Sequence, residues 1–262
     1  MPKTPSIDTP YMVPAVNRSI QILRYLQRNK KVTVTDVAHA LGVGPSTCYA
    51  ILKTLQHHNF IAFDERTKTY SLGLALLELG GSVSRDFTSV HKARSHLSTY
   101  ARETGLTVFV AARASHEHLL VVDREEPPGD VRVDIAVGTR FRITEGLSGR
   151  CFMAYLPEEE CDALIESLGL HPFAGLPAPS PAMYRAQLRA TRKAGFVTLV
   201  DLPQRGSNGV AAPIFDSEGR VLFAVAAMGL SPSITGKAIK ETGATLRRTT
   251  DLITHSLNET AT

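Results

Sequence analysis

The spacing of the hydrophobic residues changes near Gly105. Before it, apolar residues mostly recur every three or four positions, which predicts helices. After it, short apolar runs separated by turn residues predict strands with a few helices between them. The expected helices span residues 13–29, 33–41, 45–56, 72–83, 86–103, 154–168, 183–194 and 237–257. The expected strands span residues 60–63, 69–72, 107–112, 119–123, 131–137, 196–200, 210–215 and 222–228. This order predicts an α+β protein whose C-terminal part is built around one antiparallel sheet.

Two of the short helical patterns flank Gly42. Thr33 can cap the first helix, and Asp36 three residues later favours a helix N-terminus through the helix dipole. Gly42 can end that helix, because glycine adopts the left-handed conformation without steric cost. Pro45 suits the first turn of the next helix, where its missing N–H is not needed. Two short helices joined by a glycine turn predict a helix-turn-helix.

The second of these helices has one apolar and one polar face. The apolar face carries Cys48, Ile51, Leu52 and Leu55, and the polar face carries Ser46, Thr47, Tyr49, Ala50, Lys53 and Thr54. Hydroxyl groups and lysine can contact phosphates and base edges, and the free N–H groups of the first turn can face a phosphate. A plain helical hairpin with a solvated face has the same pattern and is the alternative.

A two-stranded hairpin is expected directly after this motif, because residues 60–63 and 69–72 read as strands around a polar turn. A helix-turn-helix followed by such a hairpin is a winged helix. Arg66 and Lys68 at its tip would reach a phosphate or the minor groove; the alternative is that Asp64 and Glu65 balance two solvated charges. The expected DNA contacts are Arg18, Thr35, Ser46, Thr47, Tyr49, Lys53, Arg66 and Lys68.

The charge distribution supports this location. The chain has 262 residues, of which 43% are hydrophobic and 21% charged, an ordinary globular composition whose length suggests two domains. The net charge is +4, but residues 1–73 hold nine Lys and Arg against four Asp and Glu, a net +5, which leaves −1 for the remainder. The basic excess therefore coincides with the expected winged helix, as attraction to phosphates requires.

The domain boundaries follow from the same pattern. Residues 1–12 are rich in Pro and Thr, which predicts a disordered tail. We expect the DNA-binding domain over residues 13–73, a linker helix over 74–85 and the sheet domain over 86–258. The linker is apolar nearly all round, which suits burial against a second subunit; burial within the same chain is equally compatible with it.

Several classes of function are not supported. No apolar run approaches the ~20 residues of a membrane span, and the N-terminus lacks an apolar signal core, so we expect a cytoplasmic protein. Cys48, Cys151 and Cys161 are odd in number and lack metal-ligand spacing, which predicts reduced, buried residues and no metal or cofactor. A redox- or metal-sensing regulator is an alternative that the apolar position of Cys48 disfavours.

An enzyme fused to a DNA-binding head is a further alternative. Residues 146–149 read Gly-Leu-Ser-Gly, which is not the Gly-x-Ser-x-Gly of a nucleophile elbow. The chain also has no Gly-x4-Gly-Lys-Ser/Thr phosphate loop and no His-Glu-x-x-His motif. We therefore expect no catalytic residues.

Eight short segments are informative because of their order and spacing along the chain. They are VPAVNRSIQIL at 13–23, PSTCY at 45–49, YSLG at 70–73, VGTR at 137–140, GRCFMAYLP at 149–157, AGF at 194–196, GVAAPI at 209–214 and DSEGRV at 216–221. In this arrangement the chain resembles the isocitrate-lyase-regulator (IclR) family of bacterial transcription factors over about residues 13–257. The resemblance implies a winged helix, a linker helix that dimerises and a GAF-like effector-binding domain. Such proteins are usually dimers or tetramers that repress or activate nearby catabolic genes when a small molecule binds.

The resemblance also implies an effector pocket. In the family, the segment before a Gly-Lys-Ala-like helix start presents backbone N–H groups to a ligand carboxylate. Here Ser148 and Gly149 occupy the donor positions and Arg150 stands where Lys is usual. The other implied pocket positions are Ile143, Gly146, Leu147, Leu199, Ser207, Gly209, Ala226 and Met228. Asp201 is a candidate polar partner in the loop after Leu199, and a solvated carboxylate is the alternative.

The character of these positions predicts the class of effector. In relatives that bind small hydrophilic acids several of them are polar, with Asp at the position of Leu199. Here they are mostly apolar or very small, which suits a ring because buried polar atoms need partners and apolar surface does not. We expect an aromatic or otherwise bulky organic acid, with a short oxoacid as the alternative. The predicted protein is a ligand-responsive regulator of a catabolic operon that binds a near-palindromic operator as a homodimer or homotetramer.

Overall fold

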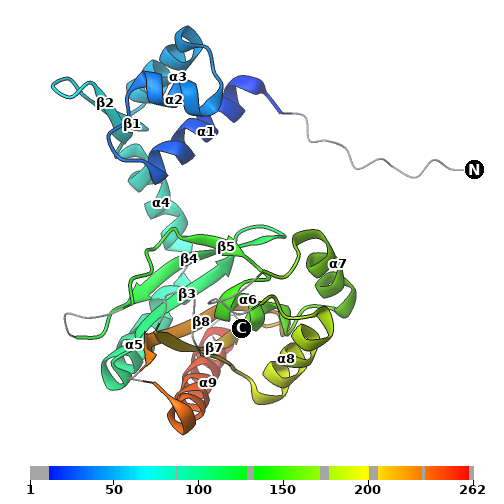
Figure 1. Ribbon diagram of the computed structural model, residues 1–262. Coiled ribbons are helices and arrows are strands. Elements are labelled where there is room, and N and C mark those ends of the chain that lie inside the picture. The colour runs from blue at the N-terminus through cyan, green and yellow to red at the C-terminus, as the bar shows by residue number, and fades with distance from the viewer. Residues whose placement is uncertain are drawn as a thin grey trace, which may run out of the picture. The chain divides into compact units, whose positions relative to one another are not determined.

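The structure, a computed structural model, describes residues 12–86, 88–128, 133–171, 177–200, 206–231 and 234–259 (Figure 1). Of the tail expected to be disordered, all but Met12 lies outside these residues. The chain separates into two compact units, one ending at residue 87 and one beginning at residue 88. In the described part of the chain, no helix has the length and apolar character that a membrane crossing requires.

The N-terminal unit is a helix-turn-helix with a wing. Its elements are α1 (Pro14–Arg28), α2 (Val34–Leu41), α3 (Pro45–His57), β1 (Ile61–Asp64), β2 (Thr69–Leu72) and α4 (Ala75–Asp86). The predicted cap of α2 is present: Thr33 Oγ1 accepts the N–H of Asp36 at 3.3 Å, and Asp36 Oδ2 accepts the N–H of Thr33 at 2.8 Å. Gly42 follows α2 in the left-handed conformation, with φ of 61°. These local signals form as predicted because each depends on residues within a few positions of one another.

One small core holds this unit together. Cys48 and Leu52 of α3 are fully buried against residues of the other elements, among them Ile22, Leu26, Val37, Ile61 and Tyr70. Val16 and Ile20 of α1 are also apolar but are about half exposed, because α1 packs through Ile22 and Leu26.

The C-terminal unit is a six-stranded antiparallel sheet with helices. Its elements are α5 (Thr88–Thr104), β3 (Thr107–Arg113), β4 (His118–Glu125), β5 (Arg140–Arg142), α6 (Gly146–Met153), α7 (Glu158–Leu168), α8 (Pro181–Ala194), β6 (Val197–Leu199), β7 (Ser207–Phe215), β8 (Val221–Leu230) and α9 (Gly236–Glu259). The strand order is β5-β4-β3-β8-β7-β6, and all neighbours are antiparallel. The predicted α+β class is therefore confirmed.

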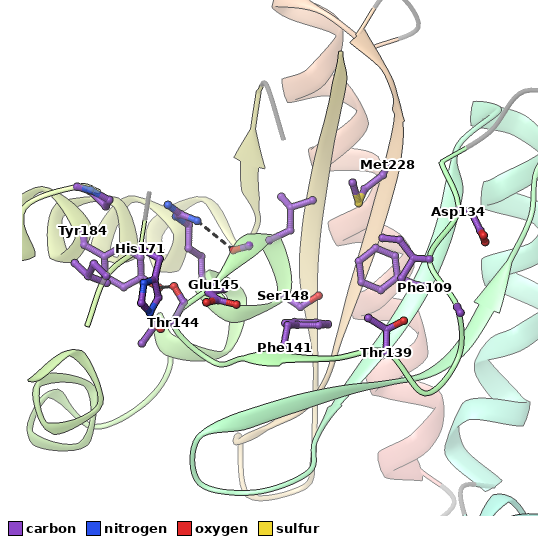
Figure 2. A pocket seen from close by; sticks show the side chains of 17 residues that line it. Phe109, Asp134, Thr139, Phe141, Thr144, Glu145, Ser148, His171, Tyr184 and Met228 are labelled. Atoms are coloured by element: carbon purple, nitrogen blue, oxygen red, sulfur yellow. Dashed lines mark hydrogen bonds between the residues drawn. The ribbon is translucent and has the colours of Figure 1, made fainter. Parts of the chain in front are cut away.

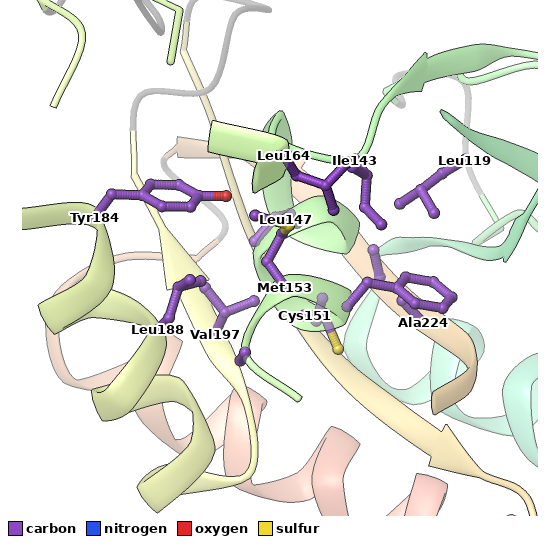
Figure 3. Close-up of a cluster of buried hydrophobic side chains, with 14 of the residues drawn as sticks. Leu119, Ile143, Leu147, Cys151, Met153, Leu164, Tyr184, Leu188, Val197 and Ala224 are labelled. Atoms are coloured by element: carbon purple, nitrogen blue, oxygen red, sulfur yellow. The ribbon is translucent and has the colours of Figure 1, made fainter. Parts of the chain in front are cut away.

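Helix α6 packs against β6, β7 and β8. Helix α5 contacts β3 and β4, α9 contacts β6 and β7, and α5 and α9 contact each other (Figure 1). The register places alternate residues of each strand toward α6. Figure 3 shows the resulting core, in which side chains of α6, α7, α8 and the sheet meet. Its members include Leu119, Ile143, Leu147, Cys151, Met153, Leu164, Tyr184, Leu188, Val197 and Ala224.

Two predicted elements of this unit are wrong. Residues 133–137 form no strand, although Val133 is buried; the edge strand beside β4 is the later segment Arg140–Arg142. Of the helix predicted for residues 154–168, only the second part forms, as α7, because the helix begins after Pro157. Residues 154–157 instead connect α7 to a helix that the pattern did not predict, α6, which begins at Gly146 and ends at Met153. Both errors concern segments whose position depends on tertiary contacts.

Candidate nucleic-acid interface and effector cavity

Helix α3 presents the face expected to read DNA. All six residues of its predicted polar face are exposed, and Tyr49 has half of its surface in solvent. The residue before the helix, Gly44, has no side chain that could cap the first-turn N–H groups. Those groups therefore stay open to an anion such as a phosphate.

A cluster of cations and aromatic rings joins α3 to the wing. The Lys53 ammonium lies 5.5 Å from the Tyr49 ring and 5.8 Å from the Phe63 ring. The Lys68 ammonium lies 5.9 Å from the same Phe63 ring, on the other side of the hairpin turn. Two positive charges that the sequence placed 15 residues apart are thus held beside one ring. The sequence reasoning missed Phe63 as the residue that connects them.

The other expected DNA contacts are exposed but more dispersed. Arg66 lies in the turn of the wing, Thr35 in the first turn of α2, and Arg18 on α1. Cys48 lies on the opposite, buried face of α3, where burial raises the pKa of its thiol. An unreactive, protonated thiol is consistent with a core role for this cysteine.

A cavity of about 630 Å³ lies beside the N-terminus of α6 (Figure 2). Its wall is formed by Phe109, Asp134, Ile135, Ala136, Thr139, Phe141, Thr144, Glu145, Gly146, Leu147, Ser148, Arg150, Leu170, His171, Pro179, Tyr184 and Met228. Figure 2 shows Phe109, Met228, Thr139 and Asp134 on one side of Ser148, Phe141 directly below it, and Thr144, Glu145, His171 and Tyr184 on the other side. The wall therefore combines aromatic and apolar side chains with polar ones.

Two hydroxyl groups in this wall are buried without a partner. Ser148 is 1% exposed and Thr144 is 4% exposed, and among the described residues neither Ser148 Oγ nor Thr144 Oγ1 has a hydrogen-bond partner. A buried hydroxyl without a partner costs about 1–3 kcal/mol. Groups of this kind in the wall of a cavity are satisfied by an ordered water or by a polar ligand atom.

Arg150 contributes a buried positive charge to the same wall. Its Nη1 donates to the Gly146 carbonyl at 3.2 Å and its Nε donates to Gln187 Oε1 at 3.4 Å. Its guanidinium carbon lies 5.2 Å from the centre of the Tyr184 ring, and the Tyr184 hydroxyl donates to the Thr144 carbonyl at 3.2 Å. Burial lowers the pKa of Arg150 from its usual value, because the charged form loses hydration.

The structure brings only some of the expected pocket residues to the cavity wall. Gly146, Leu147, Ser148 and Met228 line it. Six others do not line it: Ile143, Gly149, Leu199, Ser207, Gly209 and Ala226. Of these six, Ile143, Gly149, Ser207 and Ala226 are buried elsewhere in the unit. Asp201 lies outside the described residues.

The sheet register explains why Leu199 and Gly209 stand back from the cavity. Leu199 pairs with Gly209, and Gly209 pairs with Met228, so the three residues form one row across β6, β7 and β8. A Cβ on Gly209 would lie 2.6 Å from Leu147 Cδ1 and 3.0 Å from Met228 Cγ. Leu147 therefore occupies the space above Gly209, and only Met228 of the row reaches the cavity.

Gly149 has a different role in the structure. A Cβ at this position would collide with the backbone carbonyl of Ile143. The absence of a side chain therefore lets α6 approach the segment that carries Thr144. The sequence analysis gave no role to the cavity residues of segment 134–141, because they adjoin the helix start only in the folded chain. It had noted Arg150 only as a departure from the usual Lys.

Comparison with known proteins decides the family. The model of the IclR helix-turn-helix domain matches residues 15–65, and that of the bacterial transcriptional regulator IclR C-terminal domain matches residues 85–255. The chain belongs to the IclR family. It is therefore a transcriptional regulator with a DNA-binding helix-turn-helix and a C-terminal effector-binding domain, and not an enzyme.

Individual relatives of this IclR-family protein agree with that assignment. The regulator XynR of Escherichia coli is 26% identical over 85% of this chain and 88% of its own. An IclR regulator from Alicyclobacillus acidocaldarius has a TM-score of 0.83 at 27% identity and covers 94% of this chain and 99% of its own. An IclR homologue from Microbacterium hydrocarbonoxydans, solved with 4-hydroxybenzoate, has a TM-score of 0.79 at 20% identity. The match covers 93% of this chain and 98% of that chain. The last of these likenesses shows the fold alone.

Proposed function

We propose that this IclR-family regulator controls a catabolic operon by binding a near-palindromic operator as a dimer, and that an aromatic or similarly bulky organic acid is its effector. The observation that carries the effector class is the cavity beside α6. Its volume of about 630 Å³ and its wall of Phe109, Phe141 and Met228 suit a ring. Its unpartnered Ser148 hydroxyl suits a polar group attached to that ring.

The charged group of the effector would lie at the first turn of α6. The N-cap residue Glu145 makes no capping hydrogen bond to this helix in the described structure. The first-turn N–H groups and the positive end of the helix dipole are therefore suited to a carboxylate. The body of the acid would extend toward Phe109 and Phe141 instead of toward Leu199, because Leu147 fills the space between.

The relative solved with 4-hydroxybenzoate supports this class of ligand, since an aromatic acid is accommodated by a protein of the same fold. A two- or three-carbon oxoacid suits the cavity less well. It would leave the aromatic part of the wall without apolar contacts.

Calorimetry on the full-length protein tests the effector class. The panel contains benzoate, 4-hydroxybenzoate and phenylacetate beside glyoxylate and pyruvate. We expect binding of at least one aromatic acid that is tighter than that of either oxoacid. Tight binding of glyoxylate or pyruvate, with no aromatic acid bound, would overturn the proposed class.

The linker helix supports the proposed dimer. Leu77 and Leu79 of α4, and Leu74 just before it, are more than half exposed within the single chain. These leucines lie on more than one face of the helix, and exposed apolar side chains that lie together are typical of an interface. A dimer would place two copies of α3 in successive major grooves about 34 Å apart, which requires a near-palindromic operator.

Regulation would follow from differential affinity. An acid that binds more tightly to one arrangement of the dimer shifts the population toward it, and an acid that binds both arrangements equally shifts nothing. Mobility shifts on the upstream region at low ionic strength, with and without the acid, test this proposal. An acid that binds in calorimetry but leaves the shift unchanged would contradict it.

A further inference from the structure

The wing of the DNA-binding unit carries a lysine in a backbone conformation that lysine rarely adopts. Lys68 has a φ of 54°, in the left-handed region that favours glycine because a Cβ is crowded there. The turn itself is held by Asp64, whose Oδ1 accepts the N–H of Arg66 at 2.9 Å and that of Thr67 at 3.2 Å. The turn therefore does not need a lysine side chain at this position. A residue kept in a strained conformation is a reason to examine what its side chain does.

The Phe63 ring connects this lysine to the recognition helix. Phe63 pairs with the buried Tyr70 across the hairpin, and the two ring centres lie 4.7 Å apart, so the ring is anchored on the core of the unit. Helix α3 packs against β1, the strand that carries Phe63. The Lys53 ammonium lies 5.8 Å from the centre of this ring and the Lys68 ammonium 5.9 Å from it. Because both distances end at the same point, the two ammonium groups are at most about 12 Å apart.

Two positive charges this close repel each other, and no carboxylate of the described residues forms an ion pair with either of them. Lys53 Nζ donates to the neutral Gln56 Oε1 at 3.3 Å, which leaves its charge uncompensated. A DNA strand carries a phosphate about every 3.4 Å along the helix axis, so a run of a few phosphates spans the distance between the two ammonium groups. A single stretch of DNA backbone can therefore neutralise both.

We propose that Phe63 is a positioning residue of the DNA interface, whose ring holds Lys53 of α3 and Lys68 of the wing over one short run of DNA backbone, so that they act as one phosphate clamp. A side chain that is already placed loses less conformational freedom on binding, and this gain appears as affinity. The clamp concerns the DNA binding that family membership establishes. It does not depend on the effector or on the operator sequence.

The experiment measures binding of the full-length protein to a fluorescently labelled random-sequence duplex by anisotropy, over a series of salt concentrations. Phosphate contacts are independent of sequence, so this probe reports the clamp without knowledge of the operator. Phe63→Leu removes the ring but retains an apolar side chain and every charge, and Phe63→Tyr retains the ring. The matched control is Phe60→Leu, just before β1, because no lysine or arginine of the described chain lies over the Phe60 ring. Each is combined with Lys53→Ala and with Lys68→Ala.

The decisive quantity is the loss of affinity that each lysine substitution causes in each background. With the Phe63 ring present, we expect Lys53→Ala and Lys68→Ala each to weaken binding about 5- to 10-fold and to reduce the log–log salt slope by about one. Phe63→Leu alone should weaken binding by a similar factor, and each lysine substitution made in it should then cost only about twofold. In Phe63→Tyr and Phe60→Leu the lysine substitutions should cost about as much as in the wild type. A ring that only stabilised the fold would give the same lysine losses in every background.

A second pair of variants tests the clamp even if Phe63→Leu fails to fold. Lys68→Gly and Lys68→Ala both remove the ammonium group, but only glycine relieves the left-handed conformation. We expect equal losses of affinity and of salt slope in the two variants, and a higher Tm for Lys68→Gly in circular-dichroism melts. The protein would then lose DNA binding where it gains stability.

Losses for either lysine that are as large in Phe63→Leu as in the wild type would overturn the shared clamp. An unchanged affinity and salt slope in Lys68→Gly would also overturn it, and so would a wild type that does not bind the duplex at low ionic strength. None of these results bears on the effector class or on the near-palindromic operator, which calorimetry and mobility shifts test separately.

Discussion

The Ser148 hydroxyl has no partner among the described residues. Its removal should raise the stability of the ligand-free protein and lower the affinity for the effector. Ser148→Ala removes a buried oxygen that no described residue satisfies and leaves a small void in its place. Since an unsatisfied buried hydroxyl costs about 1–3 kcal/mol, the ligand-free variant should gain about 1 kcal/mol after allowance for the void. For a unit that spans residues 88–262, this corresponds to a rise in Tm of about 2–4 °C.

The same substitution should weaken the binding of the effector. If the Ser148 hydroxyl bonds the acid, its loss raises the dissociation constant about tenfold, or about 1.4 kcal/mol. At a ligand concentration of about 100 times the wild-type dissociation constant, the acid stabilises the wild type by about 2.7 kcal/mol and the variant by about 1.4 kcal/mol. The ligand-induced rise in Tm should therefore fall from about 5–11 °C to about 3–6 °C.

Scanning calorimetry is the suitable assay, because the chain contains no tryptophan to report unfolding by fluorescence. Thr250→Val is the control. Thr250 is fully buried on α9, but its hydroxyl donates to the Arg247 carbonyl at 3.0 Å, so its removal should lower Tm. A lower Tm for ligand-free Ser148→Ala would refute the claim that its hydroxyl is unsatisfied. An unchanged ligand response would refute its contact with the acid.

Three further predictions concern other parts of the chain. Gly209→Ala places a methyl carbon 2.6 Å from Leu147 Cδ1; it should cost about 1–3 kcal/mol and, by pushing Leu147 into the cavity, weaken aromatic acids more than pyruvate in calorimetry. Thr33→Ala removes the α2 cap and should lower stability by about 1 kcal/mol in circular-dichroism melts. Hydrogen bonds from Thr33 lower the pKa of Asp36. The stability that this carboxylate contributes is therefore present above its unfolded pKa of about 4 and is lost as the pH falls below that value. The same melts, repeated over a series of acidic pH values, would show this loss. Lys53→Ala should reduce the salt dependence of operator binding by about one unit of log–log slope, and an unaltered slope would exclude a phosphate contact there.

The sequence by itself determined the features that depend on neighbouring residues. The Thr33–Asp36 cap, the turn at Gly42 and the wing around residues 64–68 need only local hydrogen bonds and local backbone preference. The buried and exposed faces of α3 follow from its helical period. The order of the predicted helices and strands along the chain indicated the α+β sheet domain.

The tertiary structure alone decided the cavity. Phe109, Phe141 and Tyr184 belong to β3, β5 and α8, and no spacing in the sequence relates them. Leu147 separates Gly209 and Leu199 from the open space, because a side chain fills whatever volume its neighbours leave. The position of the Arg150 side chain likewise depends on contacts with α8. The sequence therefore determined most of the elements that form, and long-range packing determined which side chains line the cavity.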